Sequence, residues 1–180
     1  MTNRLLLSLS LLFMTLTANL SAGLPETLKS SGVQGGLVVH LNCGDGRGTA
    51  KLLTSDRLVV HGLDTDAANV AKGREFLQGA GVYGKVSLAV FDGKSLPYVD
   101  KLVNLVISEG KTGVSEQEIM RVLAPLGVAM IGDKKVVKPW PANIDDWSHH
   151  FQGADNNPIA MDTEVAPPPS PGLQPLGNPA

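Results

Sequence analysis

The chain has 180 residues and an apolar fraction of 43%, which suit one domain of ordinary size with tails and a packed core. The formal net charge of −2 gives no sign of the broad basic surface that binds nucleic acid. The single cysteine, Cys43, excludes a fold held together by an internal disulfide.

The first 23 residues have the pattern of a secretory signal peptide. Arg4 precedes an apolar run over residues 5–16 (LLLSLSLLFMTL), and residues 21–23 (SAG) are small, as at a cleavage site. This run is too short to cross roughly 30 Å of hydrocarbon at about 1.5 Å per residue, so no stable membrane span is expected. We expect an exported protein, periplasmic or extracellular, whose mature chain begins near Gly23 or Leu24.

Residues 24–133 alternate between predicted helices and predicted strands. A short helix over residues 25–31 comes first, and further helices are predicted over residues 49–55, 67–78 and 115–124. Because strands that are apolar throughout are typical of a parallel sheet covered on both faces, the pattern predicts a doubly wound α/β fold. A switch point beside the first strand gives the Rossmann-like order 3-2-1-4-5. The predicted strands cover residues 37–42, 58–63, 86–90, 102–107 and 127–131.

Two of these helices begin with recognisable capping residues. Asp66 precedes the helix over residues 67–78 and is a good N-cap. Ser115, with Glu118 three residues later, predicts a capping box at the start of the last helix.

Residues 134–180 lose the helix–strand rhythm. Most of the prolines lie from Pro139 onward, whereas none lies between Pro25 and Pro97. We therefore expect the sheet to end at the fifth strand and residues 134–180 to form an irregular C-terminal segment.

A glycine-rich turn follows the first predicted strand. It reads Gly44-Asp45-Gly46, then Gly48 two residues later, which is the spacing GxGxG. A dinucleotide fingerprint, GxGxxG, would place its third glycine at Thr49 instead. Ligands of open parallel sheets bind beyond the carboxyl ends of the strands, and glycines let the backbone approach them. We therefore predict that Gly44, Asp45, Gly46 and Gly48 line a ligand site.

Two acidic residues follow the next two strands. Asp64 ends the second strand twenty residues after Gly44, where a carboxylate can accept hydrogen bonds from both ribose hydroxyls of a nucleotide-like ligand. Asp92 follows the third strand. Farther along, the turn over residues 123–127 (LAPLG) precedes the fifth strand.

In this order and spacing, the features resemble those of Rossmann-type S-adenosylmethionine-dependent methyltransferases. The GxGxG turn resembles their motif I, and LAPLG resembles their LKPGG. The resemblance implies S-adenosylmethionine as cofactor, with Asp64 at its ribose and Asp92 at its adenine amino group. His40 stands where the family usually has an acid. No catalytic residue and no methyl acceptor follow from these motifs.

The C-terminal segment resembles a different part of a known architecture. Residues 138–141 (KPWP), 144–149 (IDDWSH) and 154–157 (ADNN) are similar to the start of a pyrroloquinoline-quinone-type β-propeller. In that large bacterial exported family, a methyltransferase-like domain precedes the propeller. Because a propeller needs typically four to eight blades of four strands, the resemblance implies a truncated, quinoprotein-like member.

Three functional hypotheses follow. The first is a methyltransferase with an unidentified acceptor, and the second is a non-catalytic Rossmann module of the exported quinoprotein-like family. A nicotinamide-dependent oxidoreductase is a distant third. No metal site is predicted, because His149 and His150 are adjacent and the chain has no ligand spacing of the HxxxH or CxxC kind.

Overall fold

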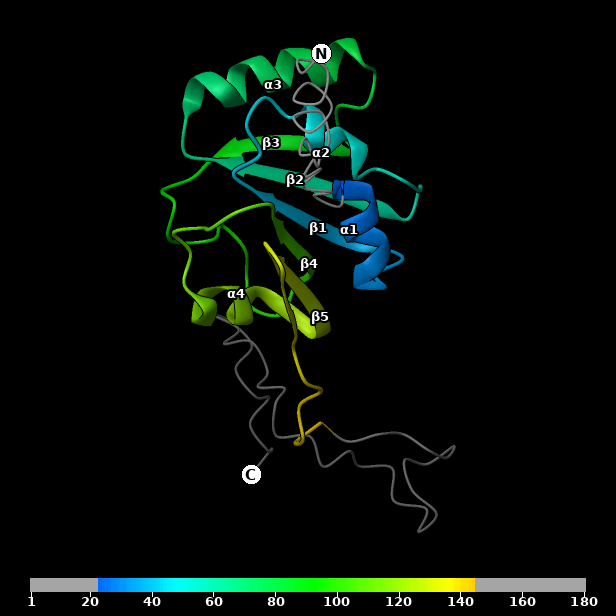
Figure 1. Cartoon of the computed structure of the whole chain (residues 1–180), viewed down its shortest axis with the longest axis vertical. Helices are drawn as coiled ribbons and strands as arrows, with labels where there is room; N and C mark the ends of the chain where they lie inside the picture. The colour runs from blue at the N-terminus through cyan, green and yellow to red at the C-terminus, as the bar shows by residue number, and fades with distance from the viewer. Residues whose placement is uncertain (1–22, 145–180) are drawn as a thin grey trace, which may run out of the picture.

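A single sheet forms the centre of residues 23–144, the part of the chain that the computed structural model describes (Figure 1). Within these residues the sheet has six strands, in the spatial order β3-β2-β1-β4-β5-β6. The strands are β1 (Gly36–Leu41), β2 (Leu58–Asp64), β3 (Val86–Val90), β4 (Val103–Ser108), β5 (Leu123–Ile131) and β6 (Lys134–Val137).

The first five strands are parallel and have the order 3-2-1-4-5, which confirms the predicted doubly wound fold. β1 pairs with β2 on one side and with β4 on the other, so the switch point lies at β1 as predicted. β5 begins at Leu123, earlier than predicted. Its pairing with β4 shifts register between Val103 and Leu105, and Leu126 has a left-handed backbone with φ of 62°.

The sheet continues beyond β5, and this corrects the prediction that it ends there. β6 pairs antiparallel with β5, with Val137 opposite Val128 and Lys134 opposite Ile131. The irregular segment expected from residue 134 therefore does not include Lys134–Val137. The sequence pattern missed this strand because two of its four residues are lysines, which interrupt the apolar run. Short, lysine-containing strands are typical of sheet edges, where they discourage pairing with other chains.

Four helices of the described residues pack on the sheet: α1 (Leu24–Ser31), α2 (Arg47–Lys51), α3 (Ala67–Gly79) and α4 (Glu116–Val122). The predicted helix over residues 49–55 was thus placed too late. The chain becomes helical directly after Gly46, which has a left-handed φ of 74°, and it turns again after Leu52. No helix among residues 23–144 is long and apolar enough to cross a membrane.

The two faces of the sheet are covered differently (Figure 1). α1, α2 and α3 cover one face, where Leu28 of α1 and Leu77 of α3 join its buried core. α4 and the irregular segment 91–102 cover the other face, where Ile119 and Leu96 belong to a second buried core. The crossover between β3 and β4 thus contains no helix, and its backbone polar groups need partners of another kind.

Two lysines at the edge of the sheet donate hydrogen bonds to helices on opposite faces. One lies in β6 and the other directly follows it. Lys135 Nζ donates to the carbonyl oxygen of Ser30 in the last turn of α1, at 2.9 Å. Lys138 Nζ donates to the carbonyl oxygens of Met120 and Leu123 at the end of α4, each at 2.7 Å. Cations near helix C-termini are stabilising, since carbonyl groups there lack partners within the helix.

The predicted N-caps are present, but the capping box is only half formed. The side chain of Asp66 accepts from the N–H of Ala68 at 2.8 Å, and that of Ser115 from the N–H of Glu118 at 3.2 Å. The carboxylate of Glu118 does not complete the box. It accepts instead from the N–H of Leu96, at 2.8 Å, because the 91–102 segment crosses α4 at this point.

Candidate functional site

The glycine loop and the end of β2 are joined by a direct hydrogen bond. The N–H of Gly44 donates to Oδ2 of Asp64 at 2.8 Å, and the N–H of Asp66 donates to Oδ1 at 2.9 Å. Asp64 is only 7% exposed, so its orientation is fixed by these two bonds and by its surroundings. The bond holds the loop after β1 against the carboxyl end of β2, where the predicted ligand site lies.

Gly44 is the glycine of the loop that faces open space. It has a left-handed φ of 54°, and a Cβ placed on it would meet no atom within 4 Å. A side chain here would project into this open space, and the predicted approach of a ligand to the Gly44 backbone stays a prediction.

The other two glycines of the motif serve packing. A Cβ on Gly46 would lie 2.7 Å from Cδ1 of Leu88, and one on Gly48, which lies within α2, would lie 2.7 Å from Cδ1 of Leu24. Both neighbours belong to the core beneath the helices. These glycines let α2 and the loop approach the core closely, which is a different reason for glycine from the predicted approach to a ligand.

Asn42 is a loop residue that the motif did not single out. It follows β1 directly, is exposed, and has a left-handed φ of 56°. Its Nδ2 donates to the carbonyl oxygen of Lys111, at 3.3 Å, which connects this loop to the loop after β4. Asparagine adopts this conformation more readily than most residues, so its place at the end of a strand was a usable signal.

Asp45 lies on the outer side of the loop. Its carboxylate accepts from Nε of Arg47 at 3.1 Å, and both side chains are more than half exposed. The guanidinium carbon of Arg47 lies 4.8 Å from the ring centre of Phe76, which adds a cation–π contact with α3.

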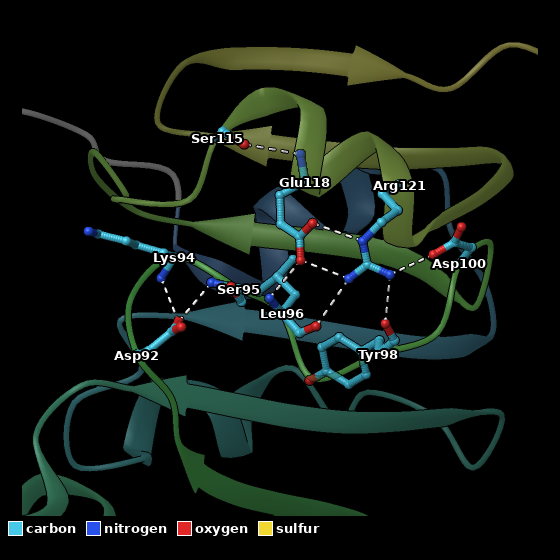
Figure 2. Close-up of polar contacts among 9 residues, drawn as sticks. All are labelled: Asp92, Lys94, Ser95, Leu96, Tyr98, Asp100, Ser115, Glu118 and Arg121. Carbon is cyan, nitrogen blue, oxygen red and sulfur yellow. Dashed lines mark hydrogen bonds and ion pairs between the residues drawn. The ribbon is translucent and has the colours of Figure 1, made fainter.

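Asp92 lies two residues after β3, whose last residue, Val90, pairs with Asp64. The N–H of Phe91 donates to the carbonyl oxygen of Asp64 at 3.0 Å, while Asp92 itself is exposed. Its Oδ1 accepts from the N–H groups of Lys94 and Ser95, at 2.8 and 2.7 Å, and these bonds hold the pKa of Asp92 below its usual range (Figure 2). Thus Gly44, Asp64 and Asp92 follow or end three adjacent strands at the carboxyl edge of the sheet.

His40 is directed away from this edge into the core. It is 2% exposed, and its Nδ1 lies 2.8 Å from Oγ1 of Thr49 in α2. Within the described residues its buried Nε2 has no hydrogen-bond partner. Burial lowers the pKa of His40 to about 4, although the nearby charge of Asp64 opposes the shift. His40 is therefore neutral at pH 7 and does not replace the acid of the family pattern.

Cys43 does not supply a reactive thiol. It is buried beside the loop, and burial together with the charge of Asp64 raises the pKa of the Cys43 thiol to about 12. A thiol is nucleophilic as its thiolate, and this cysteine remains protonated at neutral pH.

The segment from Asp92 onward is held to the rest of the fold from two sides. On α4, Glu118 and Arg121 form a forked ion pair that also bonds the backbone of the segment (Figure 2). On β2, Nδ1 of His61 lies 2.7 Å from the hydroxyl of Tyr98, with the two rings packed edge to face.

Two surface pockets lie away from the predicted ligand residues. One, of about 570 Å³, lies between α1 and the turn before β2, and includes Leu28 and Leu58. The other, of about 260 Å³, lies between α4, β5 and β6, and includes Met120 and Ile131. A single cleft shared by Gly44, Asp64 and Asp92 thus stays a prediction. In the described part of the chain no three His, Cys, Asp or Glu side chains are grouped to hold a metal ion, while His149 and His150 lie outside it.

The arrangement defines a Rossmann-type methyltransferase fold. The methyltransferase domain family matches residues 39–131, and the chain belongs to this family. The matched range runs from within β1 to the end of β5. A comparison with curated proteins gives no significant match.

Solved structures with this fold are similar at low sequence identity. A putative S-adenosylmethionine-dependent methyltransferase from Methanococcus maripaludis has 18% identity and a TM-score of 0.53, over 59% of this chain and 51% of that one. The cyclase SpnF has 23% identity and a TM-score of 0.52, over 59% and 42%. A geranyl diphosphate methyltransferase in complex with S-adenosylmethionine has 19% identity and a TM-score of 0.52, over 61% and 47%. The chain thus spans about half of the length of these proteins.

Proposed function

We propose that this protein binds S-adenosylmethionine at the carboxyl edge of its sheet and transfers the methyl group to an acceptor. The observation that carries the proposal is the carboxylate of Asp64, held by the N–H groups of Gly44 and Asp66 at the end of β2. Membership of the methyltransferase domain family supports the same function.

The residues present fit the cofactor. An ionised carboxylate offers about four lone-pair sites, so Asp64 can accept from two ribose hydroxyls in addition to its two backbone bonds. Gly44 leaves its side of the loop open, and Asp92 is exposed beside the strand end. The bound cofactor supplies a methyl group already activated on sulfonium, so the protein's contribution is to bind and orient.

The structural neighbours support the binding of S-adenosylmethionine more strongly than the transfer of its methyl group. A structural neighbour is a geranyl diphosphate methyltransferase in complex with S-adenosylmethionine, which supports the same cofactor here. Another neighbour is a cyclase, so the fold alone does not establish methyl transfer. The alternative is a non-catalytic module, and the replacement of the family acid by buried His40 is the observation in its favour. The family match favours the methyltransferase.

A thermal-shift experiment tests the proposed cofactor. A ligand that binds only the folded state stabilises it by about 2.7 kcal/mol at a hundred times its Kd. We expect S-adenosylmethionine and S-adenosylhomocysteine to raise the Tm, and NAD, the cofactor of the oxidoreductase hypothesis, to leave it unchanged. A rise with NAD alone would instead support a dinucleotide-binding protein.

We also propose that the protein is exported and that it is related to the quinoprotein-like propeller family. The support is the signal-peptide pattern of residues 1–23 and the propeller-like motifs of residues 138–157, most of which lie outside the described residues. N-terminal sequencing of secreted material should find a chain beginning near Leu24. Accumulation of the full-length chain in the cytoplasm would refute export.

A further inference from the structure

Two side chains of α4 bond the backbone in the middle of the crossover from β3 to β4. Residues 91–102 contain no helix, although a parallel crossover usually does. Glu118 Oε1 accepts from the N–H of Leu96 at 2.8 Å. Arg121 donates to the carbonyl oxygens of Leu96 and Tyr98, at 3.2 and 2.9 Å. These contacts supply some of the partners that a helix would provide internally, in addition to the bond from the N–H of Lys101 to the carbonyl oxygen of Arg121.

Glu118 and Arg121 also bind each other in a bidentate fork (Figure 2). Nε of Arg121 donates to Oε2 of Glu118 at 2.8 Å, and Nη2 donates to Oε1 at 2.7 Å. Nη1 adds a bond of 2.6 Å to the carboxylate of Asp100. Bidentate pairs of this kind fix geometry more strictly than single ion pairs do, and the Glu118 side chain is only 20% exposed. The 91–102 segment is therefore fastened in one position on α4.

The same segment begins with the acid expected at the adenine. Asp92 lies four residues before Leu96, and its Oδ1 accepts from the N–H groups of Lys94 and Ser95, so these bonds join the carboxylate to the turn that leads into Leu96. Glu118 lies near enough to Asp92 for their charges to interact, and Arg121 holds the pKa of Glu118 at about 2. Removal of Arg121 would both loosen the turn and leave an uncompensated negative charge beside Asp92.

We propose that the Glu118–Arg121 fork is a positioning device that sets the location of Asp92 and thereby the preference of the site for an adenine base. The inference rests on the proposed cofactor function and adds the residues that determine its base specificity. Neither Glu118 nor Arg121 touches the ligand in this arrangement. They act through the 92–96 turn, whose carboxylate meets the exocyclic amino group.

The test compares two ligands that differ only at that group. Calorimetric titrations use S-adenosylmethionine and its purine-riboside analogue, in which hydrogen replaces the adenine amino group and N1 remains an acceptor. A carboxylate that accepts from the amino group should give the wild-type protein a preference of at least about tenfold for adenine. In Arg121→Gln the preference should fall below about threefold, since Asp92 is no longer held in place. Arg121→Lys, which keeps the charge but not the fork, should be intermediate and serves if Arg121→Gln fails to fold.

A matched control lies at the start of α4, where Glu116 pairs with Lys134 of β6. Lys134→Gln breaks the exposed ion pair with Glu116, at 2.8 Å, without contacting the 91–102 segment, so the preference for adenine should be unchanged. A merely structural role for Arg121 would lower stability and leave the ratio of the two affinities intact, and that result would overturn the inference. Equal binding of both ligands by the wild type would also overturn it. Failure of the wild type to bind either ligand would remove the proposed function itself, and this inference with it.

Discussion

Gly44 and Asp64, twenty residues apart in the sequence, are joined by a hydrogen bond of 2.8 Å between the ends of β1 and β2. The acceptor is a carboxylate, and hydrogen bonds to ionised groups are about twice as strong as neutral ones. Asp64 therefore anchors the glycine loop as well as offering its remaining lone pairs to a ligand.

Substitution of Gly44 should weaken cofactor binding, and it should lower stability only as much as the same change at a comparable glycine elsewhere. In Gly44→Ala the new methyl group enters open space at the ligand side of the loop, and the left-handed φ of 54° costs roughly 1–2 kcal/mol. Gly81→Ala is the matched control, because Gly81 also has a left-handed φ, of 69°, and open surroundings, but lies in the turn before β3.

Urea denaturation and titration with S-adenosylmethionine should distinguish the two variants. We expect similar losses of stability in both and a loss of affinity in Gly44→Ala alone. Unchanged affinity in Gly44→Ala would place the ligand elsewhere. Gly46→Ala should lose more stability than either, because its methyl group would meet Leu88 at 2.7 Å.

His40 should make the fold less stable in acid. Its pKa is about 4 in the folded state against 6.5 as its ordinary value, so the unfolded chain takes up the proton first as the pH falls. The contribution of His40 is fully present above about pH 6.5 and is lost progressively down to pH 4, by about 3 kcal/mol in total.

His40→Gln provides the comparison, since glutamine can still bond Thr49 but does not titrate. The difference in unfolding free energy between wild type and variant, measured in urea at pH 7, 5.5 and 4.5, should change in favour of the variant as the pH falls. A difference that is independent of pH would contradict the buried, neutral state of His40.

Leu126 should be replaceable by glycine with a gain in stability. It stands where the family's LKPGG turn has a glycine, has a left-handed φ of 62°, and is 59% exposed. The left-handed conformation costs a leucine roughly 1–2 kcal/mol, part of which is offset by the greater freedom of glycine in the unfolded chain. Leu126→Gly should therefore raise the free energy of unfolding by up to about 1 kcal/mol.

Leu102→Gly is the control for this change. Leu102 is 46% exposed directly before β4, and its φ is not left-handed, so glycine there should only destabilise. Thermal unfolding of both variants checks the pair. A lower Tm in Leu126→Gly than in the wild type would show that its side chain contributes more by packing than its backbone costs.

The strand order could be predicted because it depends on features that are local in the sequence. Each of the first five strands is rich in apolar residues, and the glycine turn marks the first strand as the switch point. β6 was not predicted, because its lysines bond to residues that are distant in the sequence. Lys135, for example, donates to a carbonyl oxygen at the end of α1. Hydropathy cannot show a partner more than a hundred residues away.

The site could be predicted in part. The placement of Asp64 beside Gly44 follows from the order of the strands, since both lie at carboxyl ends of neighbours. The packing role of Gly46 and Gly48 could not be predicted, because it depends on which core side chains lie beneath the loop. The partner of Glu118 was also missed, since the capping-box pattern contains no information on the segment that crosses α4.

Calorimetric titration of the wild-type protein and of Asp64→Ala with S-adenosylmethionine tests the central claim most directly. The wild type should bind saturably, and loss of the charge-assisted bonds to ribose, worth about 1.5–3 kcal/mol, should weaken binding by roughly ten- to a hundredfold in Asp64→Ala. Asp66→Ala, which removes only the N-cap of α3, should lose about 1 kcal/mol of stability and keep its affinity. A folded wild type that does not bind at millimolar concentration, or an Asp64→Ala variant that binds as tightly as wild type, would contradict the proposed site.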